Sequence, residues 1–325
     1  MMEKKICMLV QLLLLIQLIS CVQQYDPPCH DDAPFCSGDV LKKIQMSGIF
    51  NDSKEFVDMP LKQNWTQQIE QEILNTKTTQ ELKSKLDQYF YKAGTREWHE
   101  DRLYDWKANP KIIDKIKDEK YKDWAKFLCS EWKVLVRKIN TDVRDNNQRY
   151  SMIYLNEDLV VPGGRFREIY YWDTYWSIEG LLHCELYETT KNVLLNLLQL
   201  VNKYGFIPNG GRKYYENRSQ PPFLTLMVLK YYQSTNDTGF VQRNYRTLMK
   251  EYDFWMKNRV VDIDVAGNAY QFNRYFSKLG FPRPESYKED RELAERNHID
   301  DFVKRQKLYS NIATAAESGW DFSTR

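Results

Sequence analysis

Residues 162 to 176 combine charged side chains, aromatic rings and a Gly-Gly pair within fifteen positions. The hydroxyls of a sugar need fixed donors and acceptors, such as those of Arg165 and Asp173, and its C–H faces need flat aromatic surface. Trp172 and the tyrosines beside it offer that surface. The composition of this segment therefore indicates a binding site for a polyhydroxyl ligand.

A buried helix start is the alternative for this segment, because its aromatic residues also follow a helical period from position 169 onwards. That interpretation explains any single aromatic residue well. It does not explain the interleaved charges of Arg165, Glu168 and Asp173, because charged side chains are rarely buried without a partner or a task. We therefore interpret the segment as part of a site.

The same segment resembles the first signature of the trehalase family, the glycoside hydrolases that split α,α-trehalose into two glucoses. Later segments resemble further parts of that family in the same order, namely residues 205–210, 214–215, 218–222, 283–287 and 315–321. Several matches in order are more specific than one. The Pro-Pro-Cys run at 27–29 and the Phe-Cys-Ser-Gly run at 35–38 resemble the secreted trehalases of insects.

The resemblance implies a general acid and a set of substrate contacts. Asp321 matches the family's general acid, and its neighbours Trp320 and Phe322 are expected to raise its pKa by desolvation. Arg165, Arg218 and Arg283 match three arginines that hold the substrate. The other substrate contacts implied by the resemblance are Phe166, Trp172, Asp173, Asn209, Ser219, Gln220, Pro284, Glu285 and Gly319.

Each of these residues taken alone also has a structural interpretation. The arginines can form salt bridges, for which the sequence offers Glu168, Glu216 and Glu285. Asn209 and Gly319 are common turn formers. Only the combination of the segments favours a site.

The resemblance further implies hydrolysis of trehalose with inversion and without a metal or organic cofactor. Inversion requires two carboxyl groups about 6.5 to 9.5 Å apart, one as acid and one as base. Nothing in the chain up to Arg325 resembles the family's second signature, Gln-Trp-Asp-Tyr-Pro-Asn, and the family's base belongs to that later part. We therefore expect the N-terminal portion of a longer enzyme. The alternatives are a non-catalytic protein that binds trehalose or another partner, and a different glycosidase on the same scaffold.

The first 21 residues are predicted to be a secretory signal peptide. Lys4 and Lys5 precede an apolar run at 6–19 that ends at Ser20 and Cys21. The run is short for a membrane span, so an uncleaved anchor is the weaker alternative, and a bacterial lipoprotein cleavage site is another. We expect a secreted protein, with anchoring of a longer parent left open.

Export allows the four later cysteines to oxidise, at positions 29, 36, 129 and 184. Cys29 and Cys36 are the expected pair, although three full connectivities are possible. Four glycosylation acceptor patterns begin at Asn51, Asn64, Asn217 and Asn236. We expect glycans on Asn64 and Asn236, and none on Asn217, because a glycan there would stand beside Arg218.

The charge balance argues against nucleic acid as a partner. Lysine and arginine total 47 against 45 aspartates and glutamates, and the signs are interspersed. No Cys-His spacing suggests zinc. The charge-rich residues 107–126 are interpreted as the solvent-facing side of amphipathic helices, with Ile112, Ile113, Ile116 and Trp124 pointing inward.

Helical periodicity is far more common along the chain than strand alternation. The expected helical segments are 65–74, 81–91, 121–139, 178–186, 193–204, 223–232, 245–258 and 299–315, with a capping box from Ser286 to Glu289 starting a further helix. We predict an all-α fold in which residues 22–325 form the N-terminal part of a single domain. The trehalase resemblance implies an incomplete (α/α)6 toroid, open and with exposed apolar helix faces. The loops at 160–168, 205–222, 280–287 and 317–325 carry the site residues.

Overall fold

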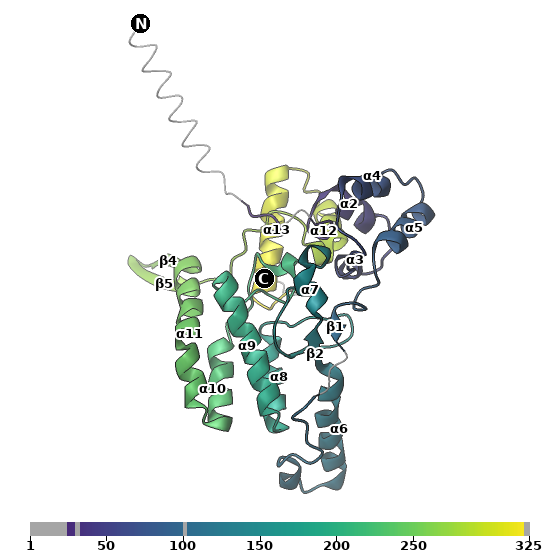
Figure 1. The fold of residues 1–325 in the computed structure, drawn as a ribbon. Helices are drawn as coiled ribbons and strands as arrows, with labels where there is room; N and C mark the ends of the chain where they lie inside the picture. Colours follow the sequence, from purple (N-terminus) through teal and green to yellow (C-terminus); the bar gives the residue numbers. More distant parts are fainter. Residues whose placement is uncertain (1–24, 30–32, 100–102, 322–325) are drawn as a thin grey trace.

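The computed structural model describes residues 25–29, 33–99 and 103–321 (Figure 1). The predicted signal peptide, residues 1–21, lies outside these ranges. The α-helices are α2 (Gly38–Met46), α3 (Ser53–Val57), α4 (Gln67–Leu74), α5 (Thr79–Tyr89), α6 (Glu119–Leu135), α7 (Thr141–Asp145), α8 (Asp173–His183), α9 (Tyr187–Tyr204), α10 (Leu224–Thr235), α11 (Thr238–Asn258), α12 (Tyr287–Arg296) and α13 (Phe302–Glu317). Helices therefore make up most of the regular structure, as the sequence predicts.

Two small sheets correct the all-α prediction. The segment predicted as a helix over 121–139 leaves the helix at Leu135, and β2 (Val136–Ile139) pairs antiparallel with β1 (Trp98–His99) and β3 (Leu159–Val160). The β-branched residues at both ends of β2 favour this extended backbone. A hairpin joins β4 (Val260–Val265) to β5 (Asn268–Asn273). Ala266 and Gly267 connect these strands with positive φ angles, which suit a two-residue hairpin turn.

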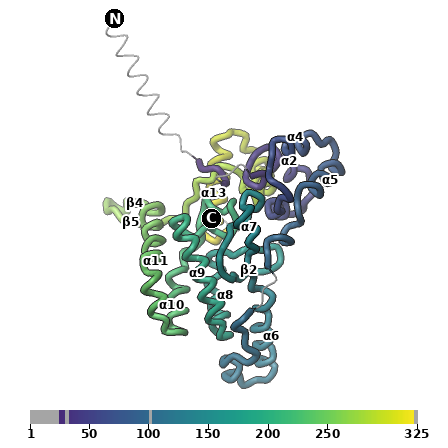
Figure 2. Tube along the Cα trace, in the orientation of Figure 1, coloured from purple at the N-terminus to yellow at the C-terminus, as the bar shows by residue number. Residues whose placement is uncertain are grey.

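The helices α8, α9, α10 and α11 lie side by side on one part of the molecule, and α2, α4 and α5 lie together on another (Figures 1 and 2). Each group encloses an apolar cluster. The larger cluster includes Leu194, Leu197 and Val201 of α9. The smaller one surrounds Ile44 and extends to residues of the loops between the helices, namely Tyr170, Tyr214 and Tyr215. The loops that carry the predicted site are thus fixed on both sides by packed side chains.

Helix α6 corrects the prediction for residues 107–126. Ile113 is buried as expected, but Trp124 is 59% exposed. Cys129 is the buried residue of α6, and Trp132, one turn further on, packs against Gly180 of α8. A Cβ atom at position 180 would stand 2.5 Å from the Trp132 ring, so this contact requires glycine.

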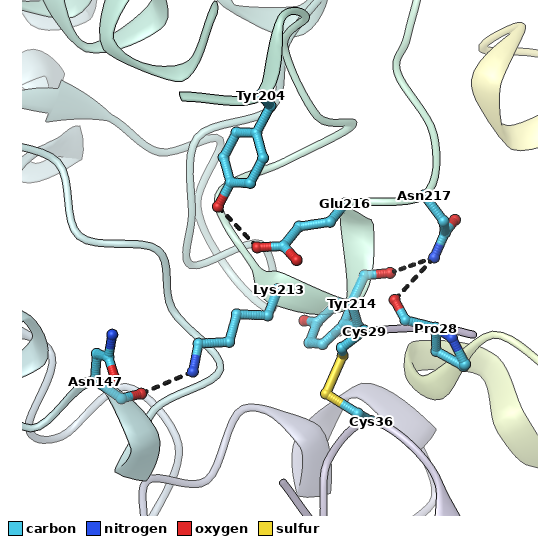
Figure 3. The surroundings of a disulfide bond; sticks show 9 residues. All are labelled: Pro28, Cys29, Cys36, Asn147, Tyr204, Lys213, Tyr214, Glu216 and Asn217. Atoms are coloured by element: carbon cyan, nitrogen blue, oxygen red, sulfur yellow. Dashed lines mark hydrogen bonds between the residues drawn. A yellow bond between two sulfur atoms is a disulfide. The ribbon is translucent and has the colours of Figure 1, made fainter. Parts of the chain in front are cut away.

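Two disulfides are present among the described residues. Cys29–Cys36 confirms the predicted pair, and Cys129–Cys184 connects α6 to the end of α8. Close to the first disulfide, the Asn217 amide donates to the carbonyls of Pro28 (3.1 Å) and Tyr214 (3.2 Å) (Figure 3). The amide nitrogen, which is the atom that an N-linked glycan would modify, is thus engaged by two carbonyls in the folded chain. Asn64 and Asn236 are exposed.

The start of α12 is predicted at the correct place but with the wrong capping contact. Ser286 precedes the helix, yet its side chain makes no capping hydrogen bond. Glu289 instead accepts a hydrogen bond of 2.7 Å from the hydroxyl of Ser53 on α3. This contact ties the beginning of α12 to the beginning of α3.

In the described part of the chain, no helix is both long and apolar enough to cross a membrane.

Candidate active site

One cavity of about 1080 Å³ gathers side chains from all four predicted loops and from the start of α3. The residues that line it are Asp52, Lys54, Pro162, Arg165, Phe166, Tyr170, Trp172, Asp173, Asn209, Tyr215, Arg218, Gln220, Arg283, Glu285, Ser286, Glu289, Gly319, Trp320 and Asp321. The volume suits a small organic ligand. The cavity thus brings together segments separated by more than 250 positions, from 52 to 321.

Eleven of the thirteen predicted site residues line this cavity, and Ser219 and Pro284 lie behind its wall. Ser219 is buried, and its hydroxyl donates to the carbonyl of Ile207 at 2.6 Å. Its backbone N–H donates to Glu317 at 2.9 Å. The carbonyl of Pro284 accepts from the side chain of Gln45 at 3.2 Å. These two residues hold the loops that carry their neighbours.

Arg218 and Glu285 form a buried pair that is only partly satisfied. The Arg218 guanidinium donates to Asn209 Oδ1 (2.8 Å) and, through Nη2, to Glu285 Oε1 (2.6 Å). Arg218 Nη1 and Glu285 Oε2 are buried and have no hydrogen-bond partner among the described residues. Buried polar atoms in folded proteins are nearly always paired. One free donor and one free acceptor in the same cavity match the requirements of a ligand hydroxyl.

The other two predicted arginines are each held by an aspartate in a two-point contact. Arg283 donates to Asp290 through Nε (3.0 Å) and Nη2 (2.7 Å). Arg165 donates to Asp52 through Nε (2.5 Å) and Nη2 (2.6 Å). Of the salt-bridge partners considered from the sequence, only Glu285 binds one of these arginines. The carboxylate of Glu168 pairs with Lys54 and Arg212, and that of Glu216 accepts from Tyr204.

The surroundings of Asp321 raise the pKa of its carboxyl group. It lies at the open surface of the cavity, but partial burial still raises its pKa above the ordinary value, while Arg218 and Arg283 oppose this and Glu285 adds to it. Burial also raises the pKa of Asp173, and the charge of Asp321 raises it further. The two carboxyl groups therefore affect each other's ionisation. Trp320 is 58% exposed and gives less cover than expected, and Phe322 lies outside the described residues.

Trp172 packs against the turn that carries Asp321. Gly319 has a φ of +74°, and a Cβ atom there would stand 2.7 Å from the Trp172 ring, so a larger residue would push the two apart. The backbone N–H of Trp172 donates to Gln220 at 3.1 Å. A second aromatic group, in which Tyr170 contacts both Phe166 and Tyr215, lines another part of the cavity. The cavity therefore has both of the components that the sequence indicates, aromatic surface and hydrogen-bonding groups.

A buried charge cluster beneath the cavity is absent from the predictions. It consists of Lys54, Asp58, Glu97, Glu168 and Arg212, each at most 2% exposed. Lys54 contacts Asp58 at 2.6 Å and Glu168 at 2.8 Å, while Arg212 contacts Glu168 at 3.1 Å and also pairs with Glu97. Glu168 accepts a hydrogen bond from Tyr170 of the cavity wall. The four-residue spacing of Lys54 and Asp58 is a sequence signal for one pair of this cluster.

The structure is a mainly helical scaffold whose loops direct arginines, carboxyl groups and aromatic rings into one cavity. Comparison with known proteins identifies the family. The family model described as Trehalase matches residues 48–325, and the chain belongs to the trehalase family.

The chain is similar to whole trehalases over part of their length. It is 42% identical to the trehalase of Homo sapiens over 322 residues, which are 97% of this chain and 54% of that protein. It is 42% identical to the trehalase of Apis mellifera over 306 residues, which are 92% of this chain and 48% of that protein. The chain thus spans about half the length of the curated relatives it matches. The neutral trehalase Nth1 from Saccharomyces cerevisiae is a more distant structural match, with a TM-score of 0.40 and 25% identity over 52% of this chain and 34% of that one.

Proposed function

We propose that this chain provides the trehalose-binding wall and the general acid of an enzyme that hydrolyses α,α-trehalose to two glucose molecules with inversion. The observation that carries the proposal is the partly satisfied Arg218–Glu285 pair in the same cavity as Asp321. A sugar hydroxyl placed between Arg218 Nη1 and Glu285 Oε2 would complete both groups. Membership of the trehalase family supports trehalose as that sugar.

Asp321 acts as the proton donor to the glycosidic oxygen in this proposal. A general acid must hold its proton at the working pH, and burial together with the charge of Glu285 raises the pKa of Asp321 in that direction. Arg218 and Arg283 bind hydroxyls and at the same time limit the rise in pKa. The mechanism uses no metal and no organic cofactor.

The base that activates water is proposed to come from the part of the family that this chain does not match. Among the carboxyl groups of the cavity, Asp52 is bound to Arg165 and Glu285 to Arg218. Each of these two carboxylates is thus engaged in an ion pair with an arginine. We also propose that the domain from residue 22 belongs to an (α/α)6 toroid. We propose that the first 21 residues direct secretion. We propose that Asn64 and Asn236 are glycosylated.

A non-catalytic, trehalose-binding protein is the second candidate, and the engaged state of Asp52 and Glu285 favours it. Glucose release and trehalose binding separate the two candidates. Two proteins are incubated with trehalose. One consists of residues 22–325, and the other is extended from the transcript to the full length of the family members. Binding is measured by calorimetry. If both proteins bind trehalose and the extended one hydrolyses it, the results support the enzyme. If both bind trehalose and neither hydrolyses it, they support the non-catalytic protein.

The acid assignment is tested in the extended protein with Asp321→Asn. Loss of a general acid typically costs about 10²- to 10⁴-fold in rate. We expect glucose release to fall by that amount while trehalose binding changes little, because an amide still fills the position of the carboxyl group. Asp173→Asn serves as the matched control, since it neutralises another carboxyl group of the cavity and is expected to weaken binding. Undiminished turnover by Asp321→Asn would reject the assignment.

A further inference from the structure

We propose that Asp52, at the start of α3, is a positioning residue that fixes the guanidinium of Arg165 in the orientation in which it meets the sugar. This inference rests on the proposed function and adds a residue from a part of the chain in which the sequence indicates no substrate contact. Asp52 and Arg165 are 113 positions apart, and both line the cavity.

The geometry of the contact leaves the Nη1 end of the Arg165 guanidinium for a ligand. Asp52 accepts from Nε at 2.5 Å and from Nη2 at 2.6 Å, so both carboxylate oxygens bind one edge of the guanidinium. Nη1, with its two N–H groups, has no hydrogen-bond partner among the described residues. Two parallel charge-assisted bonds set the plane of the guanidinium as well as its position. Without them, a side chain that is 47% exposed would sample many rotamers.

Asp52 is itself held by the backbone. Its Oδ1 accepts from the N–H of Lys54 at 3.0 Å and so caps the start of α3. The next residue, Ser53, donates to Glu289 of α12 at 2.7 Å, and its carbonyl accepts from Gln45 at 2.8 Å. Gln45 also binds the carbonyl of Pro284. Asp52 therefore connects Arg165 to the loop that carries Arg283 and Glu285.

The ionisation of Asp52 agrees with this role. Partial burial acts to raise its pKa, but the hydrogen bonds from Arg165 and from the Lys54 N–H outweigh burial and lower the pKa below the ordinary value. Asp52 therefore stays charged at a pH at which Asp321 is protonated.

A second ion pair between the same two segments provides a matched control. Arg167 contacts Glu55 at 3.4 Å, with side-chain exposures of 28% and 40% that resemble those of Arg165 and Asp52, at 47% and 39%. Neither Arg167 nor Glu55 lines the cavity. If the Asp52 contact only joined the two segments, removing either pair would have the same effect.

The first measurement is trehalose affinity of the 22–325 protein by calorimetry. Asp52→Asn keeps a capping oxygen for α3 and removes the charge that holds Arg165. We expect its dissociation constant to rise roughly three- to tenfold, the usual penalty for leaving one long side chain to be immobilised on binding. Glu55→Gln is expected to leave the constant within twofold of wild type. Arg165→Ala is expected to weaken binding at least as much as Asp52→Asn, and the double variant no further. Unchanged affinity in Asp52→Asn, or additive losses in the double variant, would overturn the proposal.

The second measurement needs no trehalose. Phenylglyoxal modifies accessible arginines, and mass spectrometry reports the rate at each position. Asp52→Asn should speed modification of Arg165 several-fold, and Glu55→Gln should speed only that of Arg167. If the wild-type protein fails to bind trehalose while these rates change as expected, the proposed function fails and the positioning role stands. Equal rates at Arg165 in wild type and Asp52→Asn would overturn the role of Asp52, with thermal melting confirming that each variant is folded.

Discussion

The buried charge cluster beneath the cavity and the outer face of α11 differ in which side chains they bury. The cluster buries charged side chains, whereas the outer face of α11 exposes apolar ones. The five ionisable residues of the cluster are almost completely buried. On α11, large apolar side chains at Tyr245, Met249, Tyr252 and Met256 are 58%, 39%, 57% and 40% exposed. Their spacing of four, three and four residues places them on one helix face, which we call the α11 apolar stripe.

The contrast shows that the partners available to a side chain, and not its residue type alone, decide whether it is buried. Each charge of the cluster meets at least one opposite charge, so its removal from water is compensated. The α11 apolar stripe, in contrast, leaves large apolar side chains exposed. The opposite face of the same helix is buried and carries Phe240, Glu251 and Trp255. The following predictions test how sharply the two regions differ.

The largest effect is expected from breaking the buried charge cluster with Arg212→Met. The change removes the ion-pair partner of Glu97, while Asp58 and Glu168 keep Lys54, and unpairing buried charges typically costs about 3–5 kcal/mol. We expect a loss of that size in the free energy of unfolding, measured by urea denaturation. Lys230→Met removes the partner of Glu179 in a partly exposed pair and should cost less than about 1 kcal/mol. Equal losses in both variants would contradict the comparison.

An intermediate effect is expected at Glu251, on the buried face of α11. Burial raises the pKa of Glu251 to about 7, against a lowering by the hydrogen bond that it accepts from Tyr171 at 2.6 Å. A carboxyl group with a raised pKa in the folded state binds its proton more tightly there than in the unfolded chain. The free energy of unfolding should therefore fall as pH rises from about 4.3 to about 7, by at most about 1.4 kcal/mol per pH unit.

Glu251→Gln keeps an oxygen for the Tyr171 hydroxyl and removes the titration. Its urea midpoint should vary less than that of wild type between pH 5 and pH 7. Glu179→Gln, a change on a partly exposed residue, should leave the wild-type slope in place. A slope that survives in Glu251→Gln would show that another group titrates in this range.

The smallest effect on stability is expected at the α11 apolar stripe. Tyr252→Glu changes a side chain that is 57% exposed, so the free energy of unfolding should change by no more than about 0.5 kcal/mol. Self-association, measured by sedimentation velocity, should decrease because the apolar surface becomes smaller and charged. Arg243→Gln makes the same change in net charge at an exposed position outside the stripe and should leave self-association unchanged. A large loss of stability in Tyr252→Glu would mean that the stripe is packed in solution.

The sequence alone determined the local properties of this protein. Helix periodicity predicted the main helices, because side-chain spacing depends on a few neighbouring residues. The seven-residue separation of Cys29 and Cys36 predicted their disulfide, because residues this close in the sequence can easily meet. The ordered motifs predicted eleven residues that the structure gathers around one cavity. The exceptions, such as β2 at the end of a helical pattern, arise where pairing with distant strands decides the backbone.

Only the tertiary structure decided which side chains meet across the chain. Asp52 reaches Arg165 over 113 positions, and Lys54 reaches Glu168 over 114. Composition and spacing carry no information on such contacts, because they depend on how the two apolar clusters bring the loops together. The same is true of the unpaired atoms of Arg218 and Glu285, since burial and the absence of a partner among the described residues are properties of the folded surroundings.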